Sequence, residues 1–366
     1  MLTKFAVKNF RGFEDWIEWD LTKSQKFQFN DFAVKDGVIK NAIIYGPNGA
    51  GKSNFSMAMF DIVRHLTRLF VPSKCFENYA CGLHPNDPVE FKYSFKFGDD
   101  TVDYSYKKDQ LGTLLEERLD YNGDKALSVD DDGPYLRMDY FHLTKFPNFN
   151  ISSAANRPSF ISYLLASIPM AEDHFLIKMQ KFVSKMLWFR SLDDRQFIGL
   201  TSNPEDIEKI IIDNGLYLEF AEFLKVASGQ DFDIIAPQEG DSHLYYKVGP
   251  SKLPLYKTAS TGTRALFVLF YWLKRASGPS LIFIDEFDAF YHYKLSLAVC
   301  KTLFKLDAQV FLSSHNTYLM TNDLLRPDCN FILNHGKLKA LSESTDKELR
   351  QGHNIEKLYR GGAFEI

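Results

Sequence analysis

The sequence predicts an α/β fold in which a mixed sheet with helices carries an antiparallel β meander and a helical insertion. Near both ends of the chain, short apolar runs alternate with helix-period patterns, which is typical of buried parallel strands and their crossover helices. Residues 89–130 alternate as a meander does, and residues 146–235 are mainly of helical period. We therefore expect residues 1–145 and 236–366 to form the two parts of the α/β domain, with 146–235 inserted between them.

Composition narrows the class of protein. The chain has 366 residues, of which 45% are hydrophobic and 25% charged, so it can bury a core and is neither disordered nor collagenous. A net charge of −4 argues against a uniformly basic nucleic-acid coat but leaves room for a local basic groove. The four cysteines lack CxxC spacing and are expected to be reduced and buried. No apolar run is long enough to span a membrane and no signal peptide is visible, so we expect a cytoplasmic protein.

The elements before the insertion follow from periodicity. Residues 3–7 alternate as a strand, residues 9–13 turn the chain, and residues 14–20 favour a second strand. Residues 41–45 form an apolar run typical of a buried parallel strand. From Asn54 to Phe70 apolar residues recur at helical spacing, and Pro72 ends that pattern.

The elements of the insertion and of the second part are predicted in the same way. Helices are expected over Phe160–Ser167, Asp173–Ser191, Pro204–Asp213, Leu216–Ala227, Thr263–Ala276 and Tyr293–Leu306. Strands are expected over Ser280–Ile284 and Gln309–Leu312, followed by a hairpin of Phe331–Leu333 and Leu338–Leu341.

A glycine-rich loop between the strand at 41–45 and the following helix is the most specific signal. It fits GxxxxGK[ST], in which glycines turn backbone amides toward phosphates and the helix N-terminus adds positive potential. Lys52 would reach the β- and γ-phosphates, and the Ser53 hydroxyl would hold Mg²⁺. The competing interpretation is a structural glycine-rich turn. The expected nucleotide-binding residues here are Gly46, Pro47, Asn48, Gly49, Ala50, Gly51, Lys52, Ser53 and Asn54.

Two acids end the apolar strand at 280–284. In a parallel sheet that strand end lies beside the phosphate loop, so Asp285 suits the carboxylate on the Mg²⁺ side and Glu286 the general base for the attacking water. Two acids ending a strand are ordinary when taken alone. The phosphate loop upstream favours the catalytic interpretation.

Two further segments join this pattern. His315 ends the strand at 309–312, where it could sense a γ-phosphate, although a lone histidine is usually structural. Ser260 precedes the helix at 263–276, so it is either an N-cap or part of an anion site together with the Gly262 amide.

These segments, in this order, resemble the ABC-type ATPases, in particular the SMC, recombination-repair and OLD-like (overcoming lysogenisation defect) branch. Asn9-Phe-Arg-Gly-Phe13 is similar to the NFRSF opening of that branch, and Asp285-Glu-Phe-Asp-Ala289 to its DExDA motif. Ser260-Thr-Gly262 takes the place of the LSGGQ signature, with threonines at two signature positions. His292 stands where OLD-like relatives often carry histidine. We find no clear Q-loop glutamine, and expect that loop within 82–89.

The resemblance implies a mechanism. Two heads would face each other, each ATP lying between one phosphate loop and the opposing signature helix, in a homodimer or higher homo-oligomer. Ser260 and Gly262 would contact the γ-phosphate in trans, Asn9 and Arg11 would join the nucleotide site, and Glu286 would drive hydrolysis. OLD-family nucleases carry a TOPRIM domain after the ATPase, whereas only 51 residues follow His315 here. The expectation is a stand-alone ATPase subunit whose nuclease or toxin is a separate effector.

Several functions remain open at this stage. The first is the ATPase subunit of a bacterial anti-phage defence system, and the alternative is a DNA repair or chromosome-maintenance ATPase that binds DNA. A transporter ATPase and a nucleotide-dependent scaffold are further readings. Basic residues that could serve DNA, or merely form a solvated helix face, are Lys178, Lys181, Lys185 and Arg190.

Overall fold

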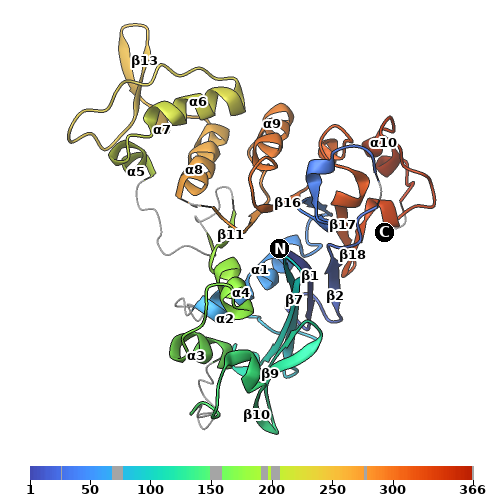
Figure 1. Cartoon of the computed structure of the whole chain (residues 1–366). Helices are drawn as coiled ribbons and strands as arrows, with labels where there is room; N and C mark the ends of the chain where they lie inside the picture. The colour runs from blue at the N-terminus through green and yellow to red at the C-terminus, as the bar shows by residue number, and fades with distance from the viewer. Residues whose placement is uncertain are drawn as a thin grey trace.

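The structure is a computed structural model, and it describes residues 1–25, 27–67, 77–148, 159–190, 197–198, 207–275 and 278–364. Two seven-stranded sheets organise it. Figure 1 shows the meander at one end, the helices α5 to α8 with the β13 hairpin at the other, and the β11–β16 region between them.

One of the two seven-stranded sheets is largely parallel and carries the candidate site. Its order is β12-β11-β15-β16-β5-β17-β18, and β11, β15, β16, β5 and β17 run parallel to one another. Three of its strands are buried at every residue, which is why their sequences are continuous apolar runs. The strands are β5 (Asn41–Tyr45), β11 (Met186–Arg190), β12 (Phe197–Ile198), β15 (Leu281–Asp285), β16 (Gln309–Ser314), β17 (Asn330–Asn334) and β18 (Lys337–Ala340).

The other sheet is antiparallel and includes the predicted meander. Its strands bury alternate residues, as in β6, so one face is apolar and the other polar. Asn122 and Gly123 both have positive φ, of 51° and 84°, as a tight hairpin turn requires. The strands are β1 (Leu2–Lys8), β2 (Ile17–Asp20), β6 (Val89–Phe97), β7 (Asp100–Lys108), β8 (Leu114–Tyr121), β9 (Asp124–Asp130) and β10 (Gly133–Leu136). The predicted mixed α/β class with a meander is confirmed.

Helices cover both sheets, and short hairpins complete the fold. The described helices are α1 (Lys52–Met59), α2 (Asp61–Thr67), α3 (Phe160–Ser167), α4 (Phe175–Ser184), α5 (Ile207–Asp213), α6 (Tyr217–Ser228), α7 (Leu255–Thr258), α8 (Thr261–Arg275), α9 (Tyr293–Leu303) and α10 (Ile355–Arg360). The hairpins are β3 (Val34–Lys35) with β4 (Val38–Ile39), and β13 (Tyr245–Val248) with β14 (Ser251–Pro254). No helix in the described ranges is both long and apolar enough to cross a bilayer.

Helix α1 lies between the two sheets, because it contacts β1 of one and β15 of the other. Aromatic rings fill the space around it. The Trp19 ring lies 5.8 Å from Phe55 of α1 and 4.6 Å from Phe311 of β16, measured between ring centroids. A helix that is packed on both sides keeps a fixed position. The phosphate loop leads directly into the N-terminus of this helix, so the position of the loop is fixed as well.

Two helix predictions need correction. The pattern over 54–70 forms two helices, α1 and α2, which break at Phe60; residues 68–70 and Pro72 lie outside the described part. The predicted helix over 173–191 ends at Ser184, and Met186–Arg190 is instead the strand β11, paired with β15. The error arose because a strand buried on both faces shows no alternation, so its apolar residues extended the helical pattern. Part of the predicted insertion therefore belongs to the parallel sheet.

Candidate functional site

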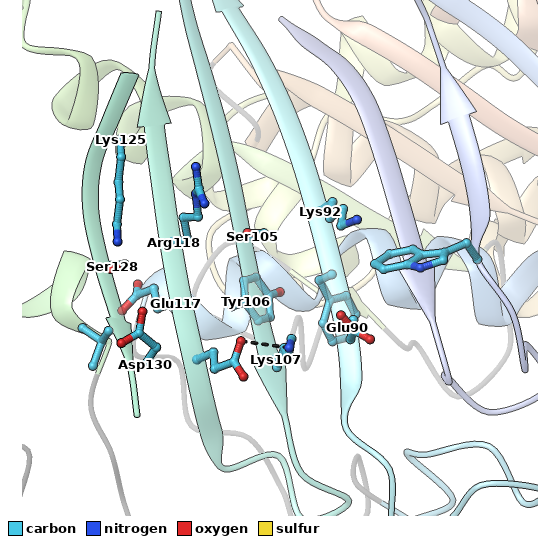
Figure 2. A pocket seen from close by; sticks show the side chains of 14 residues that line it. Glu90, Lys92, Ser105, Tyr106, Lys107, Glu117, Arg118, Lys125, Ser128 and Asp130 are labelled. Atoms are coloured by element: carbon cyan, nitrogen blue, oxygen red, sulfur yellow. Dashed lines mark ion pairs between the residues drawn. The ribbon is translucent and has the colours of Figure 1, made fainter. Parts of the chain in front are cut away.

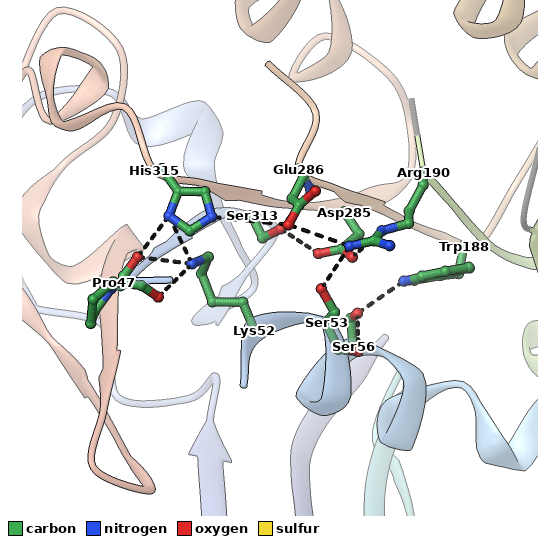
Figure 3. Close-up of polar contacts among 11 residues, drawn as sticks. Pro47, Lys52, Ser53, Ser56, Trp188, Arg190, Asp285, Glu286, Ser313 and His315 are labelled. Atoms are coloured by element: carbon green, nitrogen blue, oxygen red, sulfur yellow. Dashed lines mark hydrogen bonds and ion pairs between the residues drawn. The ribbon is translucent and has the colours of Figure 1, made fainter. Parts of the chain in front are cut away.

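The candidate site lies along one edge of the parallel sheet. Because β11, β15, β16 and β5 are parallel neighbours, their carboxyl ends meet there. The register places Arg190 opposite Asp285, and Ser314 opposite Tyr45. Figure 3 shows Lys52, Asp285, Glu286 and His315 gathered at this edge. Segments that are widely separated in the sequence thus supply one cluster of charged side chains.

The phosphate loop is shaped by glycines with no room for a side chain. A Cβ on Gly46 would lie 2.3 Å from the Leu333 carbonyl oxygen, and one on Gly51 would lie 2.8 Å from Cζ of Phe13. Gly51 also has a φ of 97°, which other residues rarely adopt. Phe13 closes the Asn9–Phe13 turn, so the N-terminal motif and the phosphate loop are fitted to each other through this ring.

The Lys52 side chain lies over the loop. Its Nζ donates to the carbonyl oxygens of Gly46 at 2.8 Å and Pro47 at 3.1 Å, and lies 3.1 Å from His315 Nδ1. Burial lowers the pKa of Lys52 from its usual value, while the charges of Asp285 and Glu286 act in the opposite direction. The ammonium group therefore lies at the mouth of the loop, held by carbonyls that phosphate oxygens could replace.

The two acids of the second motif differ in their surroundings. Asp285 is fully buried and accepts a hydrogen bond from Ser313 Oγ at 2.6 Å. Glu286 is partly exposed and has a φ of 48°, a left-handed conformation that costs about 1 kcal/mol in a residue with a side chain. Its backbone N–H donates to the same Ser313 hydroxyl at 2.8 Å. One serine of β16 thus fixes both the buried carboxylate and the turn that exposes the second one.

Arg190 belongs to the candidate site, whereas the sequence predicted it to lie on a helix of the insertion. Its Nε donates to Asp285 Oδ2 at 3.0 Å and its Nη2 to Ser53 Oγ at 3.3 Å, and the same Nη2 lies 3.3 Å from Glu286 Oε1. Trp188, two residues earlier on β11, donates from Nε1 to Ser56 Oγ of α1 at 2.9 Å (Figure 3). The one sequence feature that could have located it is the run Met186–Phe189, which is apolar at every residue, as in a buried strand, and is followed directly by arginine.

His315 lies between the loop and the acids. Its Nδ1 is 3.1 Å from the Gly46 carbonyl oxygen, and its Nε2 is 4.0 Å from Glu286 Oε1. Nδ1 donates to Gly46 in one tautomer and accepts from Lys52 in the other. The ring is exposed, so a phosphate could reach it.

The signature-like segment opens helix α8. Ser260 Oγ accepts from the Thr263 backbone N–H at 3.2 Å, so the N-cap interpretation describes its contacts within this chain. Gly262 lies against the segment after the two acids, because a Cβ there would lie 2.9 Å from the Phe290 carbonyl oxygen. Within the described part of the chain, the Ser260 hydroxyl contacts Thr263 and not the phosphate loop. His292 is exposed and precedes α9 as its N-cap residue.

The N-terminal motif is divided between two roles in this structure. Asn9 is buried and its Nδ2 donates to the carbonyl oxygens of His84 at 3.0 Å and Asp87 at 2.8 Å, within the segment where a Q-loop was expected. Arg11 instead donates from Nη1 to Asn54 Oδ1 at 3.3 Å, at the start of α1. Of the two, the structure brings Arg11 to the phosphate-loop helix and Asn9 to the 82–88 segment.

The oxygens at this edge fit a magnesium ion. Ser53 offers a hydroxyl and Asp285 a carboxylate, which are the hard oxygen donors that Mg²⁺ prefers. In this structure the guanidinium of Arg190 bridges the two groups, so the position already attracts a cation. The donor set therefore suits Mg²⁺, and the metal role of Ser53 and Asp285 stays a prediction.

Three of the four basic residues considered for DNA binding contact acidic side chains in the structure. Lys178 pairs with Asp100 at 2.8 Å, Lys181 pairs with Glu172, and Arg190 lies in the candidate site rather than on a helix. A pocket of about 250 Å³ lies along the meander strands, and Figure 2 shows the side chains that line it. Its walls mix both signs of charge: Glu90, Lys92, Lys107, Glu116, Glu117, Arg118, Lys125 and Asp130. Such a surface has no strong attraction for a phosphate backbone.

The acidic residues after β9 and the described cysteines lie outside the candidate site. Asp131 and Asp132 form the turn between β9 and β10. Cys81, Cys300 and Cys329 are free and buried, as predicted, and Cys75 lies outside the described residues.

A strand, a glycine-rich loop and a helix N-terminus with Lys52 and Ser53, beside acids from a parallel strand, define a P-loop nucleotide-binding domain. The comparison with family models agrees. The model described as "AAA domain, putative AbiEii toxin, Type IV TA system" matches residues 42–321, which is more than half of the chain. The chain belongs to this family. No curated protein matches it.

Solved structures of SMC head domains are similar over most of their length. The SMC head domain from Thermotoga maritima covers 92% of this chain and 97% of its own, at 14% identity and a TM-score of 0.42. The structure of an SMC head bound to the C-winged helix domain of ScpA covers 92% of this chain and 96% of its own, at 16% identity and a TM-score of 0.46. A Pyrococcus furiosus SMC head bound to the C-terminal domain of ScpA covers 92% and 95%, at 14% identity and a TM-score of 0.43. At these TM-scores the similarity carries no functional argument.

Proposed function

We propose that this chain binds and hydrolyses ATP with Mg²⁺, and that it acts as the ATPase subunit of a bacterial anti-phage defence system with a separate effector. The observation that carries the ATPase proposal is the convergence of Lys52, Ser53, Asp285, Glu286 and His315 at one sheet edge. What supports the defence role is the family description, which names a toxin and a type IV toxin–antitoxin system.

Each residue has a role that its surroundings suit. The loop amides and Lys52 bind the β- and γ-phosphates, and the buried Asp285 and Ser53 hold the metal. Bound there, Mg²⁺ neutralises charge on the phosphates. Glu286, which is partly exposed and follows the buried Asp285, accepts a proton from the attacking water. His315 contacts the γ-phosphate, and Arg11 supports the start of α1.

The assembly proposal concerns a second copy of this chain. Ser260 and Gly262 lie at the start of α8 without a phosphate-loop contact in the described part of their own chain, so they are offered to the loop of an opposing head. ATP bound between two heads shifts the open and closed populations only by its greater affinity for the closed state. The heads would form a homodimer or a higher homo-oligomer.

Two variants test the ATPase. Lys52→Ala should weaken ATP binding at least about tenfold, because the only lysine in the loop is lost, whereas Lys23→Ala, on the exposed surface, should change nothing. Glu286→Gln should bind ATP normally, but its turnover should fall about 100-fold or more, because general bases contribute at least that much. Wild-type affinity in Lys52→Ala, or wild-type turnover in Glu286→Gln, contradicts the assignment.

The dimer and the defence role need separate measurements. With ATP, Glu286→Gln should elute as a dimer in size-exclusion chromatography with light scattering, and a Ser260→Ala, Gly262→Ala double variant of it should not. Phage plating should show protection that needs both this chain and a neighbouring effector gene, and that Lys52→Ala removes. Protection by this chain alone argues against a separate effector.

A further inference from the structure

Arg190 has an unusual place among the groups of the proposed site. Its guanidinium contacts Ser53 Oγ at 3.3 Å, Asp285 Oδ2 at 3.0 Å and Glu286 Oε1 at 3.3 Å (Figure 3). These are the oxygens proposed to hold the metal, together with the proposed base. One protein cation therefore lies where the metal is expected to be needed.

The backbone that carries Arg190 is held within the sheet, and its side chain reaches the site from the end of a strand. Arg190 is paired with Asp285 across parallel strands, and Trp188 anchors β11 to Ser56 of α1. The Arg190 side chain is 21% exposed, whereas Asp285 is fully buried. A long side chain on a fixed strand can exchange the partners of its guanidinium without a movement of the sheet.

Repulsion between like charges means that either the Arg190 guanidinium or a magnesium ion can neutralise Asp285, but not both at close range. A fully buried carboxylate such as Asp285 is costly without a partner, and Arg190 provides one. A magnesium ion held by Ser53 and Asp285 would meet the guanidinium at close range, where like charges repel strongly. The phosphates of ATP are themselves good bidentate partners for arginine, so they offer the guanidinium a new place when the metal arrives.

We propose that Arg190 is the counter-cation of the nucleotide-free site: it neutralises Asp285 and Glu286, excludes a free divalent ion, and yields to the metal that enters with ATP. The proposal rests on the proposed function and specifies how that site is regulated. In it, Arg190 is a positioning residue for the metal ligands.

Manganese serves as the probe, because free Mn²⁺ is measured directly by electron paramagnetic resonance. Without nucleotide, the wild-type full-length chain should bind Mn²⁺ at least about tenfold more weakly than Arg190→Gln. Arg190→Lys, which keeps the charge, should behave as the wild type does. The double variant Arg190→Gln, Asp285→Asn should lose the Mn²⁺ site gained by the single variant.

Thermal unfolding gives a second measurement without nucleotide. Mg²⁺ should raise the melting temperature of Arg190→Gln, because the ion replaces the missing partner of Asp285, and should leave that of the wild type unchanged. Equal Mn²⁺ affinity in the wild type and Arg190→Gln overturns the proposal, and so does an Arg190→Gln protein that binds no Mn²⁺.

Two points keep the test decisive. If Arg190→Gln does not fold, the wild type still decides, since stoichiometric Mn²⁺ binding without nucleotide overturns the proposal and binding only with ATP supports it. Failure of the proposed function is separate. A chain that hydrolyses no ATP refutes the ATPase assignment, whereas the nucleotide-free titration of Mn²⁺ still reports whether Arg190 excludes the ion.

Discussion

Replacing Gly51 by alanine tests whether the N-terminal motif and the phosphate loop are built as one unit. Gly51 has a φ of 97°, and a Cβ there would lie 2.8 Å from Cζ and 3.0 Å from Cε1 of Phe13. The left-handed backbone costs an L-residue about 1–2 kcal/mol. Overpacking against a buried ring costs about 1–3 kcal/mol more. Gly51→Ala should therefore lower the free energy of unfolding by roughly 2–5 kcal/mol.

Gly49 offers the matched control. Its φ is 78°, but nothing lies within 4 Å of a Cβ placed there, so Gly49→Ala should cost only the backbone term of about 1–2 kcal/mol. Urea unfolding of the nucleotide-free chain measures both variants, with the midpoint and the slope fitted separately.

A double-mutant cycle isolates the part of the Gly51→Ala cost that comes from contact with the Phe13 ring. In a Phe13→Leu background the steric part should shrink, so the cost of Gly51→Ala should fall by about 1–3 kcal/mol, whereas that of Gly49→Ala should not change. Equal costs for the two glycine variants, or no coupling between Gly51 and Phe13, would refute the idea that the Phe13 ring and the loop are fitted together.

Two further predictions concern buried groups: Trp188 next to the site, and His65 of α2, which contacts Tyr104 of the meander. Trp188→Phe keeps the ring packing but removes the hydrogen bond to Ser56, so the chain should lose about 1–3 kcal/mol of stability, and Ser56→Ala should add little to that loss; fully additive costs in urea unfolding contradict the shared bond. Burial lowers the pKa of His65 to about 3, so the unfolded chain takes up a proton below pH 6.5 that the folded chain does not. Stability from this residue is present above pH 6.5 and falls by up to about 1.4 kcal/mol per pH unit as the pH drops from 6.5 toward 3. In His65→Gln that part of the pH dependence should vanish, and an unchanged slope between pH 6 and 4.5 would show that His65 is not the group responsible.

The sequence predicted those parts of the site that carry a local pattern. The loop at 46–53 has a fixed spacing between a buried strand and a helix, and the acids at 285 and 286 directly follow another apolar run. Both signals need only a few neighbouring residues. The strand positions of β5, β15 and β16 followed from the same runs, since strands buried on both faces are continuously apolar.

Arg190 could not be placed in this way. The residues from 175 to 190 contain no glycine or proline that marks the change from α4 to β11, and a five-residue strand has too few residues to show its own period. Only the pairing of β11 with β15 decides it, and that pairing joins residues about a hundred positions apart. The helix break at Phe60 was missed for a similar reason, because α1 and α2 have apolar residues on compatible spacings.

The position of Arg190 also bears on how the rest of the chain is attached to the site. After β11 the chain forms β12, which pairs with β11, and it then makes an excursion through residues 207–275 before it joins the parallel strands again at Leu281, the start of β15. Helices α5 to α8 lie within that excursion, and α8 begins with the signature-like residues. The ion pair between Arg190 and Asp285 thus joins β11, which comes before the excursion, to β15, which comes after it. A change of partner at Arg190 acts on the first of those strand ends, so metal binding and the segment that carries Ser260 share one structural connection. Breaking that pair in Arg190→Gln should therefore alter the hydrogen exchange of residues 207–275 as well as metal binding. Gly49→Ala, in the phosphate loop, should leave the exchange of that segment as it is. Unaltered exchange in Arg190→Gln would limit the role of Arg190 to the metal ligands themselves.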